Sequence, residues 1–270
     1  MAARVAFFVL AIAVLLVRNH AESPVIDSEA IRVADFSYGG STGPENWGSL
    51  SPEYAACSAG KLQSPVDITT AEVVHNKALK PLKRKYFSVN ATLINYGFNV
   101  AMEFGDAGRL TINDKNYTLS RMHWHTPSEH TINGVRYDAE LHLVHMADDG
   151  SHSVVAFLYK VSSDDDPILS EIQNKLVKLG EEKAERVEVG TFDIWKLSRN
   201  TRNYYRYHGS LTTPPCSEDV IWNVFAKVKE ITKEQVLDLK APLKSNCKDN
   251  SRPVQPLNDR EIELFDELKY

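Results

Sequence analysis

The sequence predicts a mainly β protein with a few helices (α+β), organised as one continuous domain. From Tyr86 onward, short runs of alternating apolar and polar residues are separated by Gly, Asn and Asp, which is typical of strands joined by turns. Only two segments have the apolar spacing of a helix. The 270 residues allow one large domain or two small ones, and no repeat or long linker favours a second domain.

The N-terminus has the pattern of a secretory signal peptide, which we assign to residues 1–21. Arg4 precedes an apolar run, 5–17, that is too short to span a membrane, and Ala21 offers a small residue for cleavage. Residues 22–34 show no clear periodicity and are expected to form a loose leader, so the folded domain is assigned to 35–270. We therefore expect the secretory pathway and secretion, with an organelle reached by that route as the alternative.

The predicted strands follow in order, each bounded by turn residues. Pro65 suits the start of the first strand or a sheet edge. The run 153–161 is continuously apolar, which favours a strand buried on both faces. The expected strands are 63–68, 91–95, 98–104, 109–112, 116–119, 153–161, 191–197 and 220–228.

Two helices are expected from their caps and apolar spacing. In the first, Asp166 can act as the N-cap, Pro167 occupies the first helical position and Gly180 ends the helix. The second, shorter helix covers 232–239. One apolar stripe runs along the first helix and consists of Ile168, Leu169, Ile172, Leu176 and Leu179.

The net charge, the cysteines and the glycosylation sequons limit the possible partners and the cellular compartment. The net charge of −5 gives no reason to propose nucleic acid or an anionic membrane as a partner. In an oxidising compartment, Cys57, Cys216 and Cys247 permit one disulfide and leave one cysteine over, and spacing alone cannot choose the pair. Asn90 and Asn116 begin N-glycosylation sequons, whose use depends on exposure.

A histidine-rich segment carries the strongest chemical signal. His123 and His125 are two residues apart, so on a strand both side chains point to one face. The pair Asn133–Gly134 is a strong hairpin signal, and after it Glu140, His142 and Val144 alternate on one face. A hairpin can therefore bring His142 opposite the His123 and His125 pair.

Three imidazoles on one sheet surface form a three-coordinate metal site. A tetrahedral Zn²⁺ bound there would keep its fourth position open for water. Glu140 lies on the same face as His142 and can accept the second ring N–H of a metal-bound imidazole. A single strand histidine is usually a satisfied core or surface residue. The in-phase set of three with Glu140 indicates a zinc site instead.

A second cluster is the segment Gly209-Ser-Leu-Thr-Thr-Pro-Pro-Cys. Two adjacent threonines before two prolines predict a stiff loop that holds hydroxyl groups in fixed positions. Taken alone, this segment is more simply explained as a plain surface turn, since Thr-Pro turns are common.

The histidine segment and this loop together resemble the α-class carbonic anhydrases, and the secreted form with Cys216 is similar to plant or algal members. The resemblance covers nearly the whole mature chain. Its matching segments, in order, are 43–47 (Gly-Pro-Glu-Asn-Trp), 63–67 (Gln-Ser-Pro-Val-Asp), 128–131 (Ser-Glu-His-Thr), 139–145 (Ala-Glu-Leu-His-Leu-Val-His), 210–215 (Ser-Leu-Thr-Thr-Pro-Pro) and 252–256 (Arg-Pro-Val-Gln-Pro).

The resemblance implies one domain around a large, twisted, mostly antiparallel sheet with a few peripheral helices. It implies reversible hydration of CO2 to bicarbonate and a proton by attack of zinc-bound hydroxide. His123, His125 and His142 would bind zinc, Thr212 would accept from the hydroxide and donate to Glu129, and Glu140 would support His142. Cys57 and Cys216 would form the disulfide. The substrate pocket would be lined by Val144, Leu211, Thr213, Trp222, Phe98 and the strand around Val155.

Two positions depart from the family pattern. Phe98 aligns with the histidine that relays protons in rapid members, and a phenyl ring cannot relay a proton, so regeneration of the hydroxide would need a buffer or another group. Arg121 stands where a Gln usually accepts the N–H of the first zinc histidine, and a guanidinium has no acceptor. Either that imidazole finds another acceptor, or this ligand is held less well.

Three functions remain open on these residues. The first is a carbonic anhydrase, slowed by Phe98. The second is a storage or binding protein on the same scaffold, because some plant relatives of this family resemble abundant storage proteins and both departures fit relaxed selection for catalysis. The third is a zinc esterase activity of the same site. The sequence does not indicate an oligomeric state.

Overall fold

The computed structural model describes residues 36–181, 184–198 and 202–269. The expected signal peptide, 1–21, and leader, 22–34, lie outside the described residues and stay predictions. Within the described residues, no helix is long and apolar enough to cross a membrane.

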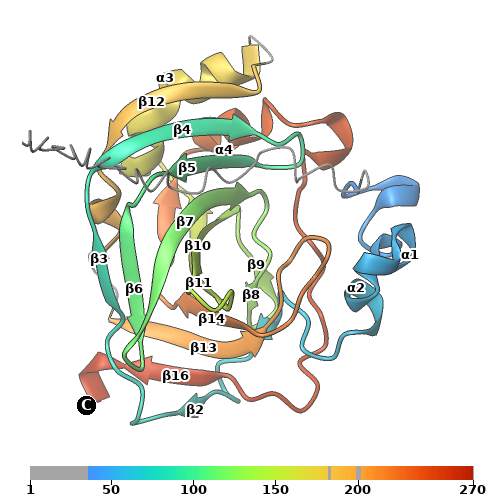
Figure 1. Ribbon diagram of the computed structural model, residues 1–270, viewed down its shortest axis with the longest axis vertical. Helices are drawn as coiled ribbons and strands as arrows, with labels where there is room; N and C mark the ends of the chain where they lie inside the picture. Colours follow the sequence, from blue (N-terminus) through green and yellow to red (C-terminus); the bar gives the residue numbers. More distant parts are fainter. Residues whose placement is uncertain (1–35, 182–183, 199–201, 270) are drawn as a thin grey trace, which may run out of the picture. The chain divides into compact units, whose positions relative to one another are not determined.

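One large sheet dominates the fold (Figure 1). Its described part has 13 strands, with the main order β12-β4-β5-β7-β10-β11-β14-β13-β16-β2. Most neighbours are antiparallel, and the pairs β11–β14, β11–β15 and β16–β2 are parallel. The predicted mainly β class with a mostly antiparallel sheet is therefore confirmed. The strands of this sheet are β2 (Val74–His75), β3 (Lys83–Tyr86), β4 (Val89–Asn95), β5 (Val100–Phe104), β6 (Gly108–Ile112), β7 (Lys115–His125), β10 (Ala139–Met146), β11 (His152–Val161), β12 (Arg186–Phe192), β13 (Asn203–Gly209), β14 (Val220–Phe225), β15 (Lys229–Ile231) and β16 (Glu263–Asp266).

The Asn133–Gly134 turn belongs to a separate small sheet. It joins β8 (Thr131–Ile132) to β9 (Val135–Arg136), and β1 (Asp67–Ile68) pairs with β8. Both turn residues have positive φ, 52° and 74°, as a tight hairpin requires. The hairpin prediction is therefore correct at the turn, but the histidine strands β7 and β10 are joined by the whole segment 126–138.

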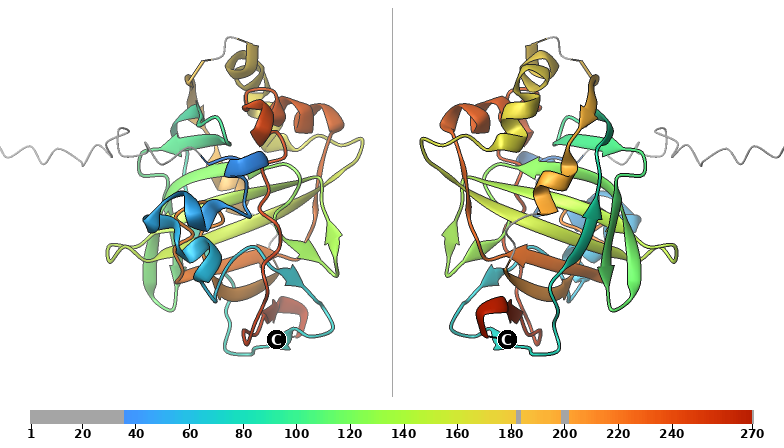
Figure 2. Two further views of the ribbon diagram at one scale, coloured as in Figure 1. Left: turned by 90° about the vertical axis from the view of Figure 1, so that its right-hand side faces the viewer. Right: turned by 90° about the vertical axis from the view of Figure 1, so that its left-hand side faces the viewer.

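The helices and 3₁₀ turns lie around this sheet (Figure 2). The long helix α3 (Pro167–Glu181) buries its predicted apolar stripe, and Asp166 Oδ1 accepts from the backbone N–H groups of Ile168 and Leu169 as the N-cap. Thr232 caps α4 (Lys233–Lys240) in a capping box with Gln235. The remaining helical elements are α1 (Trp47–Leu50), α2 (Ala56–Ala59), η2 (Gly40–Thr42), η3 (Pro52–Tyr54), η4 (Ile194–Ser198), η5 (Ser245–Cys247) and η6 (Glu267–Lys269).

Two buried clusters cover the two faces of the central strands. On β10, Leu141 and Leu143 join the larger cluster, which includes the stripe of α3, whereas Val144 joins a smaller cluster with Trp222. Alternation along β10 thus sends successive side chains to different clusters, as predicted. The strand 153–161 is also buried on both faces, because Val155 packs in the larger cluster and Val154 in the smaller one.

Several predicted boundaries were wrong. The strand predicted over 63–68 is only Asp67–Ile68, and the one predicted over 220–228 ends at Phe225. Three further differences have local reasons. The segment 191–197 is the end of β12 followed by η4, in which Ile194 and Leu197 are both buried at a spacing of three that fits a 3₁₀ turn. The segment 116–119 is part of one long strand, β7. Gly180 does not end α3. A Cβ at Gly180 would lie 3.3 Å from the Cβ of Ala241, so this glycine permits close packing.

Candidate metal centre

His123, His125 and His142 meet on one face of the sheet. In the register, His142 pairs with His123, and Glu140 pairs with His125. The ring centroids are 5.0 Å (123–125), 5.2 Å (123–142) and 4.6 Å (125–142) apart, and one ligand nitrogen from each lies within 4.8 Å of the others. The three imidazoles are buried. The predicted constellation is therefore assembled by β7 and β10.

The second ring nitrogens of two histidines are fixed by hydrogen bonds. His125 Nδ1 donates to the backbone carbonyl of Asn250 at 2.6 Å, and His142 Nε2 donates to Glu140 Oε1 at 2.7 Å. These bonds leave His125 Nε2 and His142 Nδ1 as acceptors. His125 Nε2 is buried and has no partner among the described residues. An orphaned nitrogen beside two other imidazoles fits a zinc ligand set.

The first histidine lacks this support. His123 Nδ1 is buried and has no hydrogen-bond partner among the described residues. Arg121 lies two residues earlier on the same face of β7, opposite Val144, and offers only donors. Of the two alternatives for this ligand, the described residues favour the one in which the ring N–H of His123 finds no other acceptor.

Burial keeps the three imidazoles neutral. It lowers the pKa of His123 well below the ordinary value, and that of His125 to about 4. It also lowers the pKa of His142, although Glu140 partly counters this. Arg121 adds to the shift of His123 by repulsion. Neutral imidazole is the form that binds a metal, so the ligands need not lose protons at neutral pH.

Glu140 has more partners than its sequence position suggests. Its Oε1 accepts from His142 and from His130 Nδ1 at 2.6 Å, and its Oε2 accepts the backbone N–H groups of Glu129 and His130, each at 2.8 Å. Burial alone would raise the pKa of Glu140, but His130 and His142 hold it well below the ordinary value. Glu140 is therefore an anion that fixes both the His142 ring and the Glu129 backbone.

Glu129 and Thr212 lie beside the histidines. Glu129 Oε2 is 3.5 Å from His125 Nε2, and Glu129 Oε1 accepts the backbone N–H of Arg252 at 2.9 Å. Burial raises the pKa of Glu129 to about 7, and a hydrogen bond from the Thr212 side chain partly opposes that rise. Glu129 Oε2 also lies 3.9 Å from His142 Nδ1, and it accepts no hydrogen bond from the described residues. This contact is consistent with the predicted Thr212–Glu129 pair, whose role in orienting a nucleophile stays a prediction.

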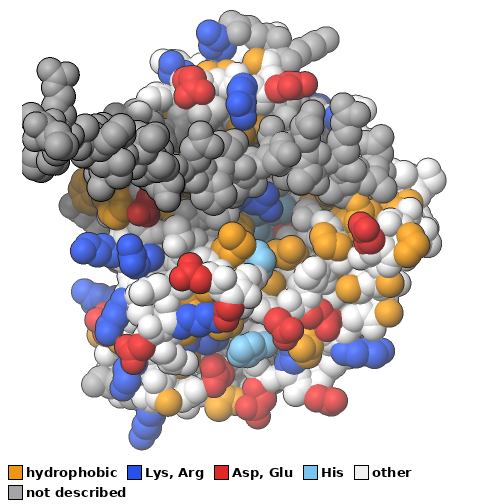
Figure 3. Space-filling view, viewed as in Figure 1, with side chains coloured by type: hydrophobic (Ala, Val, Ile, Leu, Met, Phe, Trp, Pro, Cys, Tyr) orange, Lys and Arg blue, Asp and Glu red, His pale blue; other side chains and the backbone are white. Residues whose placement is uncertain are grey.

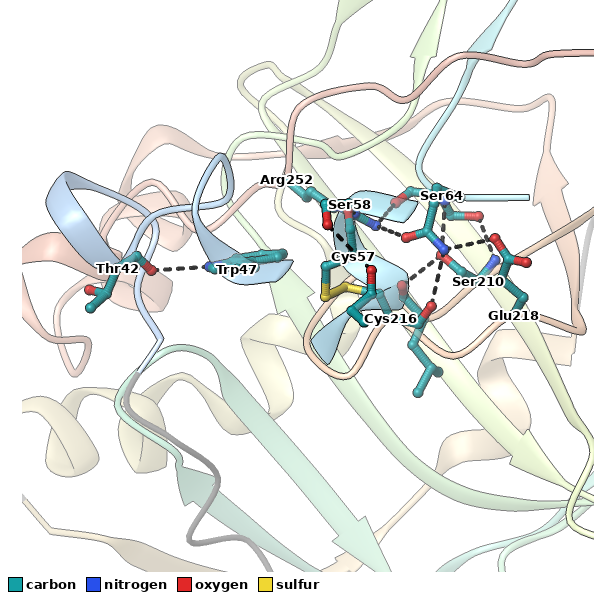
Figure 4. The surroundings of a disulfide bond; sticks show 12 residues. Thr42, Trp47, Cys57, Ser58, Ser64, Ser210, Cys216, Glu218 and Arg252 are labelled. Carbon is teal, nitrogen blue, oxygen red and sulfur yellow. Dashed lines mark hydrogen bonds between the residues drawn. A yellow bond between two sulfur atoms is a disulfide. The ribbon is translucent and has the colours of Figure 1, made fainter. Parts of the chain in front are cut away.

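The loop that carries Thr212 is fixed from several sides. Cys216 forms a disulfide with Cys57 of α2, and the backbone N–H of Ser64 donates to Ser210 Oγ at 2.9 Å (Figure 4). Arg252 Nη2 donates to the Cys57 carbonyl at 2.8 Å. A Cβ at Gly209 would lie 2.1 Å from Ser64 Oγ, so only glycine allows this approach. The segment is thus a held loop rather than a plain surface turn.

The residues expected to line the substrate pocket do not all lie on the same face of the sheet. Val144 and Trp222 belong to the smaller buried cluster, and the Trp222 ring lies 4.8 Å from that of His142. Leu211 and Thr213 are half-buried beside Thr212. The strand around Val155 contributes Val154 to this side, and not Val155 itself. It packs in the larger cluster on the other face, because strand alternation places its neighbour Val154 on the histidine side.

Phe98 is half-buried in an aromatic group. Its ring stacks on Tyr96 at 5.9 Å and lies 4.8 Å from the ring of Phe36. Asn250 Nδ2 donates to the Phe98 carbonyl at 3.0 Å, and the same Asn250 receives His125. Phe98 therefore lies next to Asn250, which supports the second histidine ligand, and the Phe98 side chain has no titratable group.

The remaining sequence-predicted residues lie outside the centre. The Cys57–Cys216 pairing is confirmed, and Cys247 is free and buried. Asn90 and Asn116 are both exposed, on β4 and β7. Three supporting residues were missed by the sequence reasoning, namely His130, Asn250 and Arg252. Two of them lie inside the quoted motif segments, but no local spacing signals their contacts.

Comparison with known proteins places the chain in a family. Residues 42–265 match the family model described as eukaryotic-type carbonic anhydrase. The chain belongs to this family. Carbonic anhydrases of this kind depend on zinc, and the three histidines are able to hold it.

The similar proteins include carbonic anhydrases and a dioscorin. Alpha carbonic anhydrase 7 of Arabidopsis thaliana is 42% identical over 224 residues, which are 83% of this chain and 81% of that protein. A carbonic anhydrase from Thermovibrio ammonificans in complex with sulfanilamide has 39% identity and a TM-score of 0.78, covering 86% of this chain and 99% of that one. A dioscorin complexed with ascorbate has 40% identity and a TM-score of 0.85, covering 87% and 100%.

Proposed function

We propose that this carbonic anhydrase relative is a working zinc enzyme that interconverts CO2 with bicarbonate and a proton. The main support is the complete set of metal ligands, because three buried, neutral histidines lie together on two central strands. Glu129 and Thr212 lie beside them. A perturbed carboxylate next to such a set is typical of a catalytic site. When bound, Zn²⁺ supplies a nucleophilic hydroxide at neutral pH.

Thr212 and Glu129 orient the nucleophile. When the Thr212 hydroxyl donates its proton to the Glu129 carboxylate, its oxygen can only accept from the attacking group. The attacking oxygen then has its remaining lone pair directed away from Thr212. Glu129 is itself held by the Arg252 backbone N–H, so the direction of this hydrogen bond is fixed before substrate arrives.

Val144 and Trp222 supply an apolar surface next to the His142 ring. CO2 has no net dipole and gains little from polar contacts, so an apolar wall retains it without competing hydrogen bonds. The half-buried Leu211 extends this wall beside Thr212. Bicarbonate is charged and strongly hydrated, and it therefore leaves such a surface readily.

Proton removal depends on external buffer in this proposal. Phe98 lies where rapid members of the family have a histidine, and its phenyl ring cannot accept a proton. The hydration step therefore retains its machinery, while the return of the nucleophile is slowed. The rate becomes limited by proton acceptors in solution.

The same proposal includes export through the secretory pathway. The Cys57–Cys216 disulfide is typical of an oxidising compartment, and both sequon asparagines, Asn90 and Asn116, are exposed. Mass spectrometry of the protein from its native tissue tests this, because cleavage after Ala21 and glycan mass at Asn116 or Asn90 are expected.

A storage or binding role is the second candidate. It is favoured by the 40% identity to dioscorin and by the changes at Phe98 and Arg121, which both weaken support for catalysis. High abundance in a storage tissue together with zinc well below one per chain would favour this role over the enzyme.

Stopped-flow CO2 hydration by zinc-quantified protein tests the proposal. We expect activity, and we expect Thr212→Val to lower kcat about 100-fold at unchanged zinc content, because valine keeps the shape and removes the orienting hydroxyl. Thr191→Val is the control, since it makes the same change at an exposed position of β12 outside the metal centre. Equal rates for the wild type and Thr212→Val would contradict the assigned role of Thr212.

A further inference from the structure

A cavity of about 210 Å³ lies away from the metal centre. It is lined by the segment before β3, the turn between β6 and β7, and Arg206 of β13, which come together at one side of the sheet (Figure 1). On β13, Tyr205 and Tyr207 pack in the cluster that contains Trp222, whereas Tyr204 packs in the other cluster. Arg206 therefore projects from the face opposite the histidines.

Arg206 is held in one orientation. Its side chain is buried, with 8% exposure, and its Nε donates to Asn223 Oδ1 at 2.8 Å. Asn223 is itself fixed, because its Nδ2 donates to Ser153 Oγ at 3.1 Å. The guanidinium carbon lies 5.1 Å from the centroid of the Tyr204 ring. These contacts use one N–H and leave both Nη groups for the cavity that Arg206 lines.

The charge of Arg206 has no close counter-ion in the described part of the chain, where no carboxylate lies within 4.0 Å of it. Glu263 is its register partner on β16, but Glu263 Oε1 accepts from Asn76 Nδ2 at 2.5 Å. Burial lowers the pKa of Arg206, and Glu263 opposes that shift only in part. A buried cation is costly unless it is paired, so an anion in the cavity would lower the free energy of the folded state.

Two lysines extend the positive charge to the cavity rim. Lys80 and Lys83 line the cavity and are exposed, and Asp114 is the carboxylate that lines it. Figure 3 shows Lys and Arg side chains gathered along the left side of the molecule, where β3 and β6 lie. This local excess contrasts with the overall net charge of −5.

We propose that this cavity binds a tetrahedral oxyanion of the phosphate class, either as the free ion or as the terminal group of a small phosphate ester. Arg206 presents its planar pair of Nη groups to two oxygens, as guanidinium groups do with phosphate, and Lys80 and Lys83 neutralise the remaining charge. The volume of about 210 Å³ is smaller than an ordinary cofactor pocket, which suits an ion or a compact ester.

Calorimetric titration of the zinc-loaded protein at low ionic strength tests the proposal, with inorganic phosphate and glucose 6-phosphate as the two probes. The test variant is Lys80→Ala/Lys83→Ala. The matched control is Lys85→Ala/Arg109→Ala, which removes the same charge from paired positions on β3 and β6 that do not line the cavity. Any phosphate that binds at the metal centre is common to both variants and cancels in the comparison.

We expect saturable binding that weakens about tenfold or more in the test variant and less than about twofold in the control, because charge-assisted hydrogen bonds are lost in one and only diffuse attraction in the other. Arg206→Lys keeps the charge but not the paired donors, and it should also weaken binding; its near-ultraviolet circular dichroism reports whether it folds. Binding of phosphate alone would identify a free-ion site, and equal or tighter binding of the ester would identify a terminal-group site.

Two results would overturn the assignment. One is the absence of saturable binding of either probe by the wild-type protein. The other is an equal loss of affinity in the test variant and its control, which would mean attraction to the basic surface as a whole rather than binding in the cavity.

Discussion

At the residue scale, Arg121 bears most directly on the metal centre. It leaves His123 Nδ1 buried without an acceptor, and its charge adds to the lowering of the His123 pKa. The other two ligands have acceptors, Asn250 and Glu140. One of three ligands is therefore held only by packing, and the free energy of zinc binding should reflect this.

Arg121→Gln is expected to increase zinc affinity about 10–100-fold, because the glutamine carbonyl can accept the His123 N–H. Competition with a chelator of known affinity at neutral pH measures the change without reference to activity. Arg109→Gln is the control, since it removes the same charge from an exposed position on β6. Equal zinc affinity of Arg121→Gln and wild type would show that His123 is already held adequately.

The residues that bear the chemistry were readable from spacing, but their supports were not. His123, His125, Glu140 and His142 alternate with a period of two, and a strand converts that period directly into one face. Asn250 meets His125 from a position 125 residues away, through a backbone carbonyl that any residue could offer. Local patterns do not contain a contact of that kind.

At the scale of the element, β10 carries a histidine on each of its two faces, and the two histidines have different surroundings. His142 faces the metal centre, whereas His145 lies on the other side, where its Nε2 is 2.7 Å from the hydroxyl of Tyr86 and its Nδ1 donates to the Ser153 carbonyl at 3.2 Å. Burial lowers the pKa of His145 to about 3. The register with β7 shifts between Val144 and His145, an irregularity that the pattern of β10 does not reveal.

His145 should make stability fall in acid. The unfolded chain binds a proton at this site below its ordinary pKa of 6.5, while the folded protein resists protonation until about 3. The contribution is thus complete above 6.5 and is lost as the pH falls from 6.5 toward 3, at up to about 1.4 kcal/mol per pH unit.

Urea unfolding of wild type and His145→Gln across this pH range measures the effect. Other buried histidines titrate in both proteins, so the difference between their free energies of unfolding isolates His145. The wild type should lose stability more steeply as the pH falls. Parallel curves for the two proteins would show that His145 carries no such linkage.

At the scale of the whole molecule, we expect the fold to persist without the metal. The ligands sit on β7 and β10, which are central strands of the large sheet, and both faces of those strands pack in extensive buried clusters. Small zinc domains lack such a core and unfold when the metal is removed. Here we expect the opposite.

Zinc removal by a chelator should leave the far-ultraviolet circular dichroism unchanged and lower Tm by several degrees, in proportion to the binding free energy. Added Zn²⁺ should restore the Tm. A metal-free protein that has lost its secondary structure would contradict this expectation.

The alternation of apolar and polar residues predicted the fold class, but it did not predict several of the individual strands. β13 has tyrosines on both faces, because Tyr204 packs in one cluster and Tyr205 in the other, so it shows no alternation of apolar and polar residues. The short strands β2 and β16 pair with each other although they lie far apart in the sequence, with Val74 opposite Glu263. Such long-range pairing is fixed by the packing of the whole sheet and not by any local signal.

The central claim is that an intact hydration site works with an external proton acceptor. The most direct test is stopped-flow CO2 hydration by protein with one zinc per chain, over a series of imidazole buffer concentrations. We expect the rate to rise with buffer and then saturate, and we expect Phe98→His to reduce that dependence. Full zinc occupancy with no hydration at any buffer concentration would contradict the enzyme and leave the storage or binding role as the better account.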